Sequence, residues 1–276
     1  MIRAVVIGAT GRMGRALVRA ASESSDMTVV AAVASQTSSS LGQDVGELAG
    51  LRPLGVHITS DLPGALATAQ VAIDFSSSKA TQTNLAACRH AHKPLIIGTT
   101  GFGEQVTNMF AAAAREIPLL VAPNTSIGVA LLTELVRTAA RTLSQFDIEI
   151  IEAHHRTKRD APSGTALALG RVAAEARDRQ IDAAATGTGA APERSKGARG
   201  GATPRRPGDI GFAVVRAGDI VGEHTVLFAG PGERISLGHC ATDRAIFARG
   251  ALQAAAWLAS QPAGRYDMRD VIGYKS

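Results

Sequence analysis

The chain has 276 residues, which is enough for one large domain or two modest ones. Hydrophobic residues make up 45% and charged residues 19%, which excludes a disordered or fibrous protein. The formal net charge is +5, but the basic residues are dispersed and aromatic residues reach only 4%, so we expect no nucleic-acid partner and instead a positive pocket for a small anion. No apolar run reaches the roughly 18–20 residues of a membrane span, so no membrane partner is expected and the cytoplasm is the expected location.

The chain contains two cysteines, Cys88 and Cys240, which lie far apart in the sequence. Both stand among aliphatic residues, so we expect two buried thiols and no disulfide, as in a reducing compartment. Their spacing is not that of metal ligands, and no metal site is expected.

Up to Asn124, short apolar runs alternate with helical patterns. Residues 2–8 predict a buried strand, residues 11–24 a helix, and residues 27–33 a second strand, which together form a βαβ unit. The later strands are expected over 71–77, 94–101 and 118–124, and the later helices over 63–69, 79–91 and 105–117. This alternation is typical of an α/β fold with a doubly wound parallel sheet of the Rossmann type.

After Asn124 the pattern changes, which indicates a second domain of the α+β class. The expected helices cover 128–146, Ser163 to about 179, and 245–261, and the expected strands cover 147–155, 210–230 and 233–241. The strands are joined by tight turns and predict an antiparallel or mixed sheet with one covered face. Residues 183–209 carry almost no large apolar side chain, and we interpret them as a long mobile loop.

The segment GATGRMG, residues 8–14, places three glycines between a predicted strand and a predicted helix. Gly8 permits a tight exit from the strand, Gly11 lets backbone N–H groups approach a pyrophosphate, and Gly14 lets the helix lie close to the sheet. An anion would then lie at the positive end of the helix. The segment therefore predicts a dinucleotide site, with an ordinary strand-to-helix turn as the alternative.

The end of the second predicted strand lacks the carboxylate that usually binds the adenosine ribose. Ser35 stands there instead, and Arg12 is the nearest candidate partner for a 2′-phosphate, so NADPH is tolerated and NADH is not excluded. Further cofactor contacts are expected from hydroxyl-rich loops at 74–77, 98–101 and 122–128, because ligands of such sheets lie beyond the carboxyl ends of the strands. Ordinary turns remain the alternative for each loop taken alone.

Residues 152–170, EAHHRTKRDAPSGTALALG, gather titratable and cationic groups ahead of a helix. His154 and His155 follow a strand, so their side chains should point to opposite sides, which argues against a shared metal. With Pro162 in the first helical turn and Ser163 as the cap, the next backbone N–H groups would be available to an anion. The alternative is a solvated basic loop ahead of a capped helix.

Taken together, GATGRMG, GTTG at 98–101, EAHHRTKRDAPSGTALALG and VRAGDIVGEHTV at 215–226 closely resemble the 4-hydroxy-tetrahydrodipicolinate reductase (dihydrodipicolinate reductase) family. The resemblance extends from Ile2 to about Gly273. It implies reduction of the dihydrodipicolinate ring by NADPH or NADH, giving tetrahydrodipicolinate in lysine and diaminopimelate biosynthesis. It also implies a homotetramer, a dinucleotide-binding domain over 1–127 plus 241–276, and a substrate-binding and oligomerisation domain over 128–240.

The resemblance also implies roles for individual residues. His154 matches the family's proton donor or acceptor, Lys158 its proton donor, and His155 a substrate contact, while Gly164 and Thr165 match the pair that holds a substrate carboxylate. The residues that match the cofactor site are Gly8, Ala9, Thr10, Gly11, Arg12, Met13, Gly98, Thr99, Thr100, Ala122, Pro123, Asn124 and Thr125. Because an unperturbed histidine titrates near 6.5 and a lysine near 10.4, an imidazolium is the better matched acid at neutral pH.

The chain departs from the family pattern in two places. Ala34 and Ser35 replace an acidic residue that is often followed by arginine, which leaves the nucleotide preference open. The segment 183–209 is longer than expected, and Arg205 and Arg206 near its end are candidates to approach the substrate. Two alternatives to the reductase are another Rossmann-type NAD(P)-dependent dehydrogenase, which would not require two carboxylates, and a non-catalytic dinucleotide sensor, which would need no proton donor.

Overall fold

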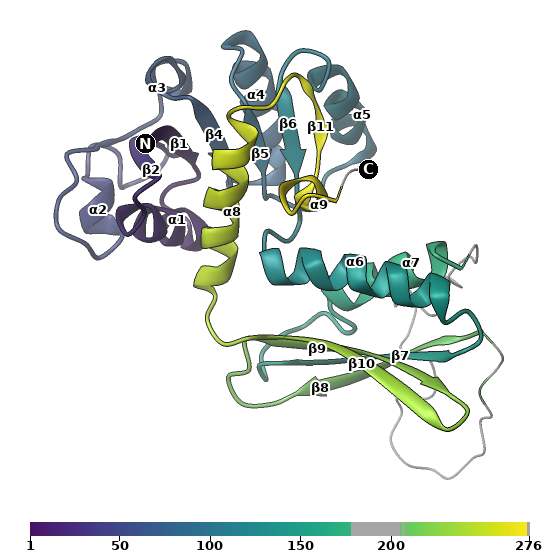
Figure 1. Ribbon diagram of the computed structural model, residues 1–276. Coiled ribbons are helices and arrows are strands. Elements are labelled where there is room, and N and C mark those ends of the chain that lie inside the picture. The colour runs from purple at the N-terminus through teal and green to yellow at the C-terminus, as the bar shows by residue number, and fades with distance from the viewer. Residues whose placement is uncertain (178–204, 206–207, 275–276) are drawn as a thin grey trace. The chain divides into compact units, whose positions relative to one another are not determined.

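The computed structural model describes residues 1–177, 205 and 208–274, and the chain forms two compact units. Unit 1 comprises Met1–Ile127 and Ala245–Ser276, and unit 2 comprises Gly128–Arg244. Most of the loop expected over 183–209 lies outside the described residues. Figure 1 shows the elements of both units.

Unit 1 is built on a seven-stranded parallel sheet with the order β11-β6-β5-β4-β1-β2-β3. The strands are β1 (Ile2–Ile7), β2 (Met27–Val33), β3 (Ile58–Thr59), β4 (Val71–Asp74), β5 (Leu95–Ile97), β6 (Pro118–Val121) and β11 (Gly264–Tyr266). The central strands are aliphatic and buried, as strands covered on both faces must be. The predicted Rossmann-type doubly wound sheet is therefore confirmed.

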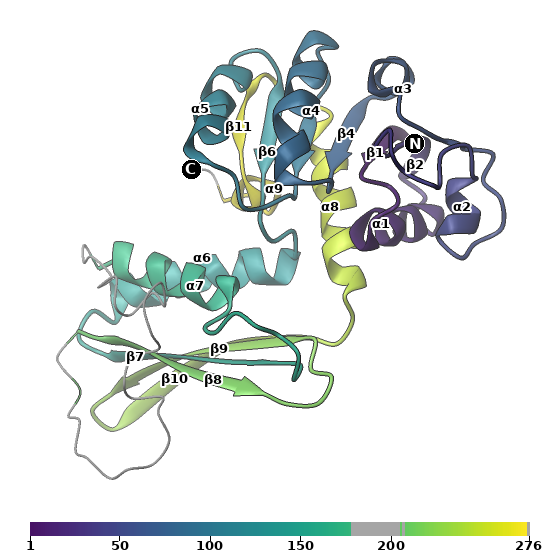
Figure 2. The same ribbon diagram turned by 180° about the vertical axis from the view of Figure 1, so that it is seen from behind.

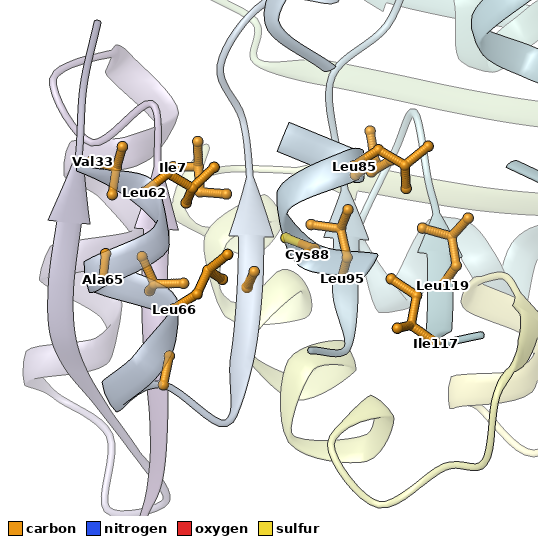
Figure 3. Close-up of a cluster of buried hydrophobic side chains, with 14 of the residues drawn as sticks. Ile7, Val33, Leu62, Ala65, Leu66, Leu85, Cys88, Leu95, Ile117 and Leu119 are labelled. Carbon is orange, nitrogen blue, oxygen red and sulfur yellow. The ribbon is translucent and has the colours of Figure 1, made fainter. Parts of the chain in front are cut away.

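Helices cover both faces of this sheet, as the two views in Figures 1 and 2 show. One face carries α1 (Arg12–Ser22) and α8 (Ala245–Leu258), which pack on each other, with the short helices α2 (Val45–Leu48) and α9 (Met268–Val271) beside them. The other face carries α3 (Leu62–Thr68), α4 (Ser78–His90) and α5 (Glu104–Ala113). Figure 3 shows the core beneath them, where Leu66, Leu85 and Leu95 are fully buried.

Unit 2 has a four-stranded mixed sheet with the order β10-β9-β7-β8. Its strands are β7 (Asp147–His154), β8 (Ile210–Arg216), β9 (Gly222–Gly230) and β10 (Glu233–Ala241). β7 pairs parallel to β8 and antiparallel to β9, and β9 pairs antiparallel to β10, which confirms the mixed sheet. The helices α6 (Ile127–Thr142) and α7 (Gly164–Glu175) cover one face, where Ile148, Ile150 and Phe228 form the core.

The structure differs from the predictions at several points. β3, α2 and β11 were not predicted, because two to four residues are too few to show a periodic pattern. β10 ends at Ala241 as predicted, but unit 2 continues to Arg244, beyond the predicted boundary at residue 240. Cys88 is buried as predicted, but Cys240 is exposed because it alternates with His239 and Ala241 on β10 and points to the uncovered face of the sheet.

Candidate active site

The glycine turn after β1 is shaped by close backbone approaches. Gly8 has φ +82°, and a Cβ atom there would lie 2.7 Å from the carbonyl oxygen of Phe75, at the end of β4. The N–H groups of Gly8 and Ala9 both donate to the carbonyl of Val33, at the end of β2. A Cβ at Gly14 would lie 2.3 Å from the Gly8 carbonyl oxygen. Glycine is thus required for packing at both positions, and the ends of three strands meet at this turn.

The N-terminus of α1 is not capped by a side chain. Gly11 is the N-cap residue, no side-chain hydrogen bond closes the helix, and the first turn contains no acidic residue. Thr10 and Met13 are partly exposed, and Arg12 is exposed. A glycine cradle that a Cβ would fill, beside an uncapped positive helix end, fits the pyrophosphate of a dinucleotide.

The loop after β5 adds two features that suit a cofactor. A Cβ at Gly98 would lie 2.1 Å from the ring of Phe75, so this position also accepts only glycine in the present packing. The hydroxyl of Thr99 is buried and has no hydrogen-bond partner within the described part of the chain. A buried hydroxyl without a partner is costly, and a bound ligand would satisfy it. Thr100, next in the loop, is exposed.

Several polar groups of the loop after β6 already form hydrogen bonds within the protein. The N–H of Ala122 donates to Ile97, and the side-chain oxygen of Asn124 accepts from the N–H of Ser126 at 2.9 Å. The hydroxyl of Thr125 is buried and donates to the carbonyl of Phe247 in α8 at 2.6 Å. The Thr125 side chain therefore anchors α8. Pro123, the other residue predicted in this loop, is exposed.

Ser35 lies at the carboxyl end of β2, as predicted. It is exposed, and its hydroxyl shares a 2.9 Å hydrogen bond with the hydroxyl of Thr37 while also accepting from the Thr37 N–H. This small hydroxyl turn can meet a ribose or a phosphate, and it carries no negative charge that would repel a 2′-phosphate.

In unit 2, the alternation of β7 places Glu152 and His154 on the covered face of the sheet, where both are buried. His154 Nδ1 lies 2.5 Å from one Glu152 carboxylate oxygen. Two nitrogens of Arg216, on the neighbouring strand β8, donate to the same carboxylate at 2.8 Å each. The N–H of Ser163 also donates to it, at 2.9 Å. We call Glu152, His154, Ser163 and Arg216 the Glu152 cluster.

The charges of this cluster shift the pKa values of its members. Burial raises the pKa of Glu152, but the hydrogen bonds from Arg216, His154 and Ser163 outweigh it, so the pKa is lowered overall. Burial lowers the pKa of His154, and the neighbouring carboxylate of Glu152 only partly opposes this. His154 is therefore harder to protonate than an unperturbed histidine.

His224, on β9, packs against the Glu152 cluster. Its ring meets that of His154 edge to face at 5.1 Å between centroids, and its Nε2 lies 3.0 Å from the Ser163 hydroxyl. Burial, assisted by the nearby charge of His154, lowers the pKa of His224 to about 4. His224 is therefore neutral at physiological pH and serves to pack and hydrogen-bond the site.

Ser163 caps α7, because its hydroxyl accepts from the N–H of Ala166 at 3.1 Å. The helix begins at Gly164, so Pro162 precedes the cap and does not occupy the first turn as predicted. The positive end of α7 is thus next to the residue that donates to Glu152. Gly164 and Thr165 form its first turn, in the position expected for binding an anion.

Lys158 lies in the loop ahead of α7, and its Nζ donates to the Asp160 carboxylate at 2.8 Å. Burial raises the pKa of Asp160, but hydrogen bonds from Lys158 and from the N–H groups of Asp160 and Gly164 lower it overall. The Asp160 carboxylate therefore already contacts two of the donors expected to hold a substrate carboxylate. His155 is partly exposed, and its Nδ1 lies 2.8 Å from the Thr157 hydroxyl.

Some of the predicted site residues come together and one does not. His154, Lys158 and the start of α7 lie at one end of unit 2. Lys158 is close enough for its charge to lower the pKa of His154, and the N–H of Ser163, the cap of α7, donates to Glu152, the partner of His154.

Arg205 lies elsewhere, because it pairs with Glu149 and Asp147 at the start of β7. That is the end of β7 opposite His154, so Arg205 does not join the other predicted site residues. Arg206 lies outside the described residues.

Sequence reasoning missed the roles of Glu152, Arg216 and His224. The i, i+2 spacing of Glu152 and His154 on a predicted strand was a usable signal for the first. The roles of Arg216 and His224 depend on the pairing of β7 with β8 and β9, which no local pattern reveals.

Within the ranges that the structure covers, no group of His, Cys, Asp and Glu side chains is arranged to hold a metal ion. The helices described also include none long and apolar enough to cross a membrane.

Comparisons with known proteins agree along the whole chain. Residues 2–125 match the family described as dihydrodipicolinate reductase, N-terminus, and residues 128–272 match dihydrodipicolinate reductase, C-terminus. The 4-hydroxy-tetrahydrodipicolinate reductase of Halorhodospira halophila is 48% identical, covering 97% of both chains, and that of Alkalilimnicola ehrlichii is 50% identical, covering 98% of both. A dipicolinate-bound dihydrodipicolinate reductase from Paenisporosarcina sp. TG-14 has a similar structure, with TM-score 0.77, 26% identity and 99% coverage of both chains.

A Rossmann-type unit with an open glycine turn, joined to a mixed-sheet unit with a buried histidine beside a helix N-terminus, defines the chain as an NAD(P)H-dependent oxidoreductase. More specifically, the chain belongs to the dihydrodipicolinate reductase family.

Proposed function

We propose that this protein is a 4-hydroxy-tetrahydrodipicolinate reductase, which reduces the dihydrodipicolinate ring to tetrahydrodipicolinate in lysine and diaminopimelate biosynthesis. The observation that carries the proposal is the meeting of His154, Lys158 and the N-terminus of α7 at one end of unit 2, in a chain about half identical to reductases of that name. A ring with two carboxylates needs cations, backbone N–H donors and a proton source, and these residues provide them.

Within unit 1, we assign the binding of NADPH or NADH to the glycine turn and the neighbouring loops. Gly8, Gly11 and the first turn of α1 would hold the pyrophosphate, and Thr99 would bind the cofactor with its buried hydroxyl. When bound, the reduced nicotinamide supplies a hydride. The uncharged turn at Ser35, with Arg12 exposed at the start of α1, supports acceptance of both nucleotides, with NADPH tolerated at its 2′-phosphate.

Within unit 2, we assign binding of the dicarboxylate and protonation. The N-terminus of α7 and the Lys158 ammonium would hold a substrate carboxylate, with His155 as a further contact. His154 would hold the proton at Nε2, because Nδ1 is engaged by Glu152. A doubly negative substrate would raise the pKa of His154 and so favour its protonated form when it is needed.

The decisive experiment supplies the purified protein with enzymatically generated 4-hydroxy-tetrahydrodipicolinate and follows oxidation of NADPH and NADH in separate reactions. We expect turnover with both nucleotides and competitive inhibition by dipicolinate. Binding of NADPH without turnover of this substrate would support the sensor alternative. Turnover of substrates that lack two carboxylates, and not of this one, would support another dehydrogenase.

We further propose a homotetramer assembled through the sheet of unit 2. Ile151 and Val215 lie at neighbouring outward positions of β7 and β8, and the two residues are 38% and 44% exposed. Exposed apolar side chains on an uncovered sheet face are typical of interfaces. Light scattering should give the mass of four chains, and an Ile151→Glu, Val215→Glu double variant should give a smaller one. A wild-type monomer would contradict this assembly.

We also propose that the protein acts in the cytoplasm. The structure supports this through Cys88 and Cys240, both of which are free thiols. Fractionation of cells that produce the protein should recover it with cytoplasmic markers, and recovery with the membrane or outside the cell would contradict the proposal.

A further inference from the structure

The Glu152 cluster contains a charged group that the proposed reaction has not used. The Glu152 side chain is completely buried, yet its two oxygens meet four donors on three different segments of unit 2. One of these donors is the proposed acid, His154. Another is the N–H of Ser163, the cap of the helix proposed to bind the substrate carboxylate. A single carboxylate thus contacts both functional parts of the site.

We propose that Glu152 is a positioning residue: it fixes the tautomer and orientation of His154 and holds the imidazole ring at a fixed position relative to the N-terminus of α7. The inference rests on the proposed function for its catalytic meaning. The control of the His154 tautomer by Glu152 can be tested in the absence of turnover.

The tautomer follows from hydrogen-bonding chemistry. An ionised carboxylate only accepts hydrogen bonds, so the Nδ1 atom of His154, 2.5 Å away, must carry a proton. In the neutral ring, Nε2 is then the unprotonated nitrogen and the position at which a proton is gained and given. A Cβ atom at Gly222 would lie 3.0 Å from this Nε2, so glycine at that position leaves Nε2 uncrowded.

Arg216 keeps Glu152 ionised and fixed in place. Its two-pronged pairing with the carboxylate has the geometry of the strongest charge-assisted hydrogen bonds. Arg216 also donates to the carbonyl of Asp160 at 2.6 Å, which ties the loop containing Lys158 to the same cluster. The carboxylate therefore joins β7, β8, the Lys158 loop and the cap of α7.

The groups that face His154 come from every element around it. They are Glu152 on β7, Lys158 in the loop, Arg216 on β8 and His224 on β9. Of these, only Glu152 raises the pKa of His154. Loss of its negative charge should therefore move the protonation of His154 to lower pH, whereas a purely structural role for Glu152 would not predict such a shift.

The test is a Glu152→Gln variant compared with wild type. We expect kcat to fall roughly 10- to 100-fold, the range found when the hydrogen-bonding partner of a metal-binding histidine is removed, and the limb of the pH profile that depends on protonated His154 to move to lower pH. The Kd for NADPH should stay within about twofold, because the glycine turn is built by unit 1. Unchanged kcat and an unchanged pH profile would overturn the proposal.

A matched control lies on the same strand. Glu149 also pairs with an arginine, since Arg205 donates to it at 2.7 Å, but it belongs to the opposite end of β7 from His154. Glu149→Gln should leave kcat and the pH profile unchanged. A loss equal to that of Glu152→Gln would show that removing any paired carboxylate from β7 has the same effect, and would overturn the specific role.

Glu152→Gln leaves the partly buried Arg216 beside a neutral group, so the variant could fail to fold. A Glu152→Gln, Arg216→Gln double variant removes both charges, and Arg216→Gln alone keeps the contact between Glu152 and His154. We expect the double variant to fold and show the low kcat, and Arg216→Gln alone to lose less activity than the double variant, because Glu152 still contacts His154. If both variants fold and have equal activity, the proposal is overturned.

A second readout does not depend on turnover. The ¹⁵N shifts of the His154 ring should show Nδ1 protonated in the neutral wild-type protein. In Glu152→Gln, the amide oxygen should turn to Arg216 and the amide nitrogen to Nδ1, which moves the proton to Nε2. If the tautomer differs in this way between wild type and Glu152→Gln, but wild type does not reduce the dicarboxylate, the proposed function fails and the control of the tautomer by Glu152 stands. If the tautomer is the same in both proteins, the role of Glu152 fails.

Discussion

Two helix N-termini carry the proposed chemistry, and they are built in opposite ways. α1 begins after Gly11 with no capping side chain and no acidic group in its first turn. α7 begins after Ser163, whose hydroxyl caps it, next to a loop with Lys158 and Asp160 and a buried carboxylate beneath. The first end presents backbone alone, and the second combines backbone with titratable side chains.

The difference reflects what each end has to do. A pyrophosphate is held in one protonation state throughout the reaction, so shape and N–H groups are sufficient, and a side chain at Gly8 or Gly14 would only obstruct. Protonation of a substrate requires a group whose charge changes, and such a group needs neighbours that set its pKa and orientation. We therefore expect the end of α7 to respond to pH and the end of α1 to respond to backbone crowding.

The largest expected effect separates the two ends by function. A His154→Ala, Lys158→Ala double variant should lose at least about 10³-fold in kcat, because both the acid and a cation for the carboxylate are removed. Its Kd for NADPH, measured by calorimetry, should match that of wild type. His57→Ala, which removes an exposed histidine of unit 1, serves as control. Near-normal turnover by the double variant would show that the site has been wrongly assigned.

The second prediction concerns acid sensitivity at the α7 end. Because the pKa of His224 falls from 6.5 to about 4 on folding, its contribution to stability is fully present above about pH 6.5 and is lost as the pH falls toward 4. The loss should amount to about 3 kcal/mol in the free energy of unfolding. Urea titrations across this range should therefore show a shallower decline for His224→Asn than for wild type. Parallel declines would mean that His224 titrates normally.

The third prediction concerns crowding at the α1 end. In Gly14→Ala the new methyl group would meet only backbone, at 2.3 Å from the Gly8 oxygen, so the turn must shift. We expect the Kd for NADPH to rise at least about tenfold, together with a lower Tm. Gly103→Ala is the control, because Gly103 likewise stands at the start of a helix of unit 1, as the N-cap of α5, but has open space around its Cβ position. An equal Kd for NADPH in both variants would show that the close backbone packing at Gly14 is not needed for cofactor binding.

The smallest effect is expected at Asp160. Its carboxylate contacts Lys158 and the N–H of Gly164, so it competes with a substrate carboxylate for the same donors. Asp160→Asn should lower the KM for the dicarboxylate about two- to fivefold, in keeping with the strength of an exposed ion pair. Asp26→Asn, an exposed change of equal charge in unit 1, should leave the KM unchanged. A raised KM in Asp160→Asn would instead show that Asp160 holds Lys158 in place for the substrate.

The sequence predicted unit 1 well because its strands and helices have local periodic patterns. It also placed the glycine turn correctly, since the functions of Gly8 and Gly14 depend on neighbours that the βαβ unit always brings together. Thr125 shows the limit of this reasoning, because its hydroxyl bonds α8, an element more than a hundred residues further on.

The site in unit 2 was predicted only in part. The alternation of the strand correctly separated a buried His154 from a partly exposed His155. The same alternation places Glu152 beside His154, but the sequence does not show that Arg216 would be opposite both, because this requires the parallel register in which His154 pairs with Arg216. Long-range register of this kind is set by the whole core and not by neighbouring residues.

The order of segments in unit 1 has a consequence for its synthesis. Its last sheet strand, β11, and the helix α8 come from the final residues of the chain, after all of unit 2. Until they emerge from the ribosome, β6 is an unprotected sheet edge and one face of the sheet lacks its largest covering helix. A fragment that stops at residue 127 should therefore aggregate, whereas unit 2, encoded as one uninterrupted stretch, is complete before unit 1 can close.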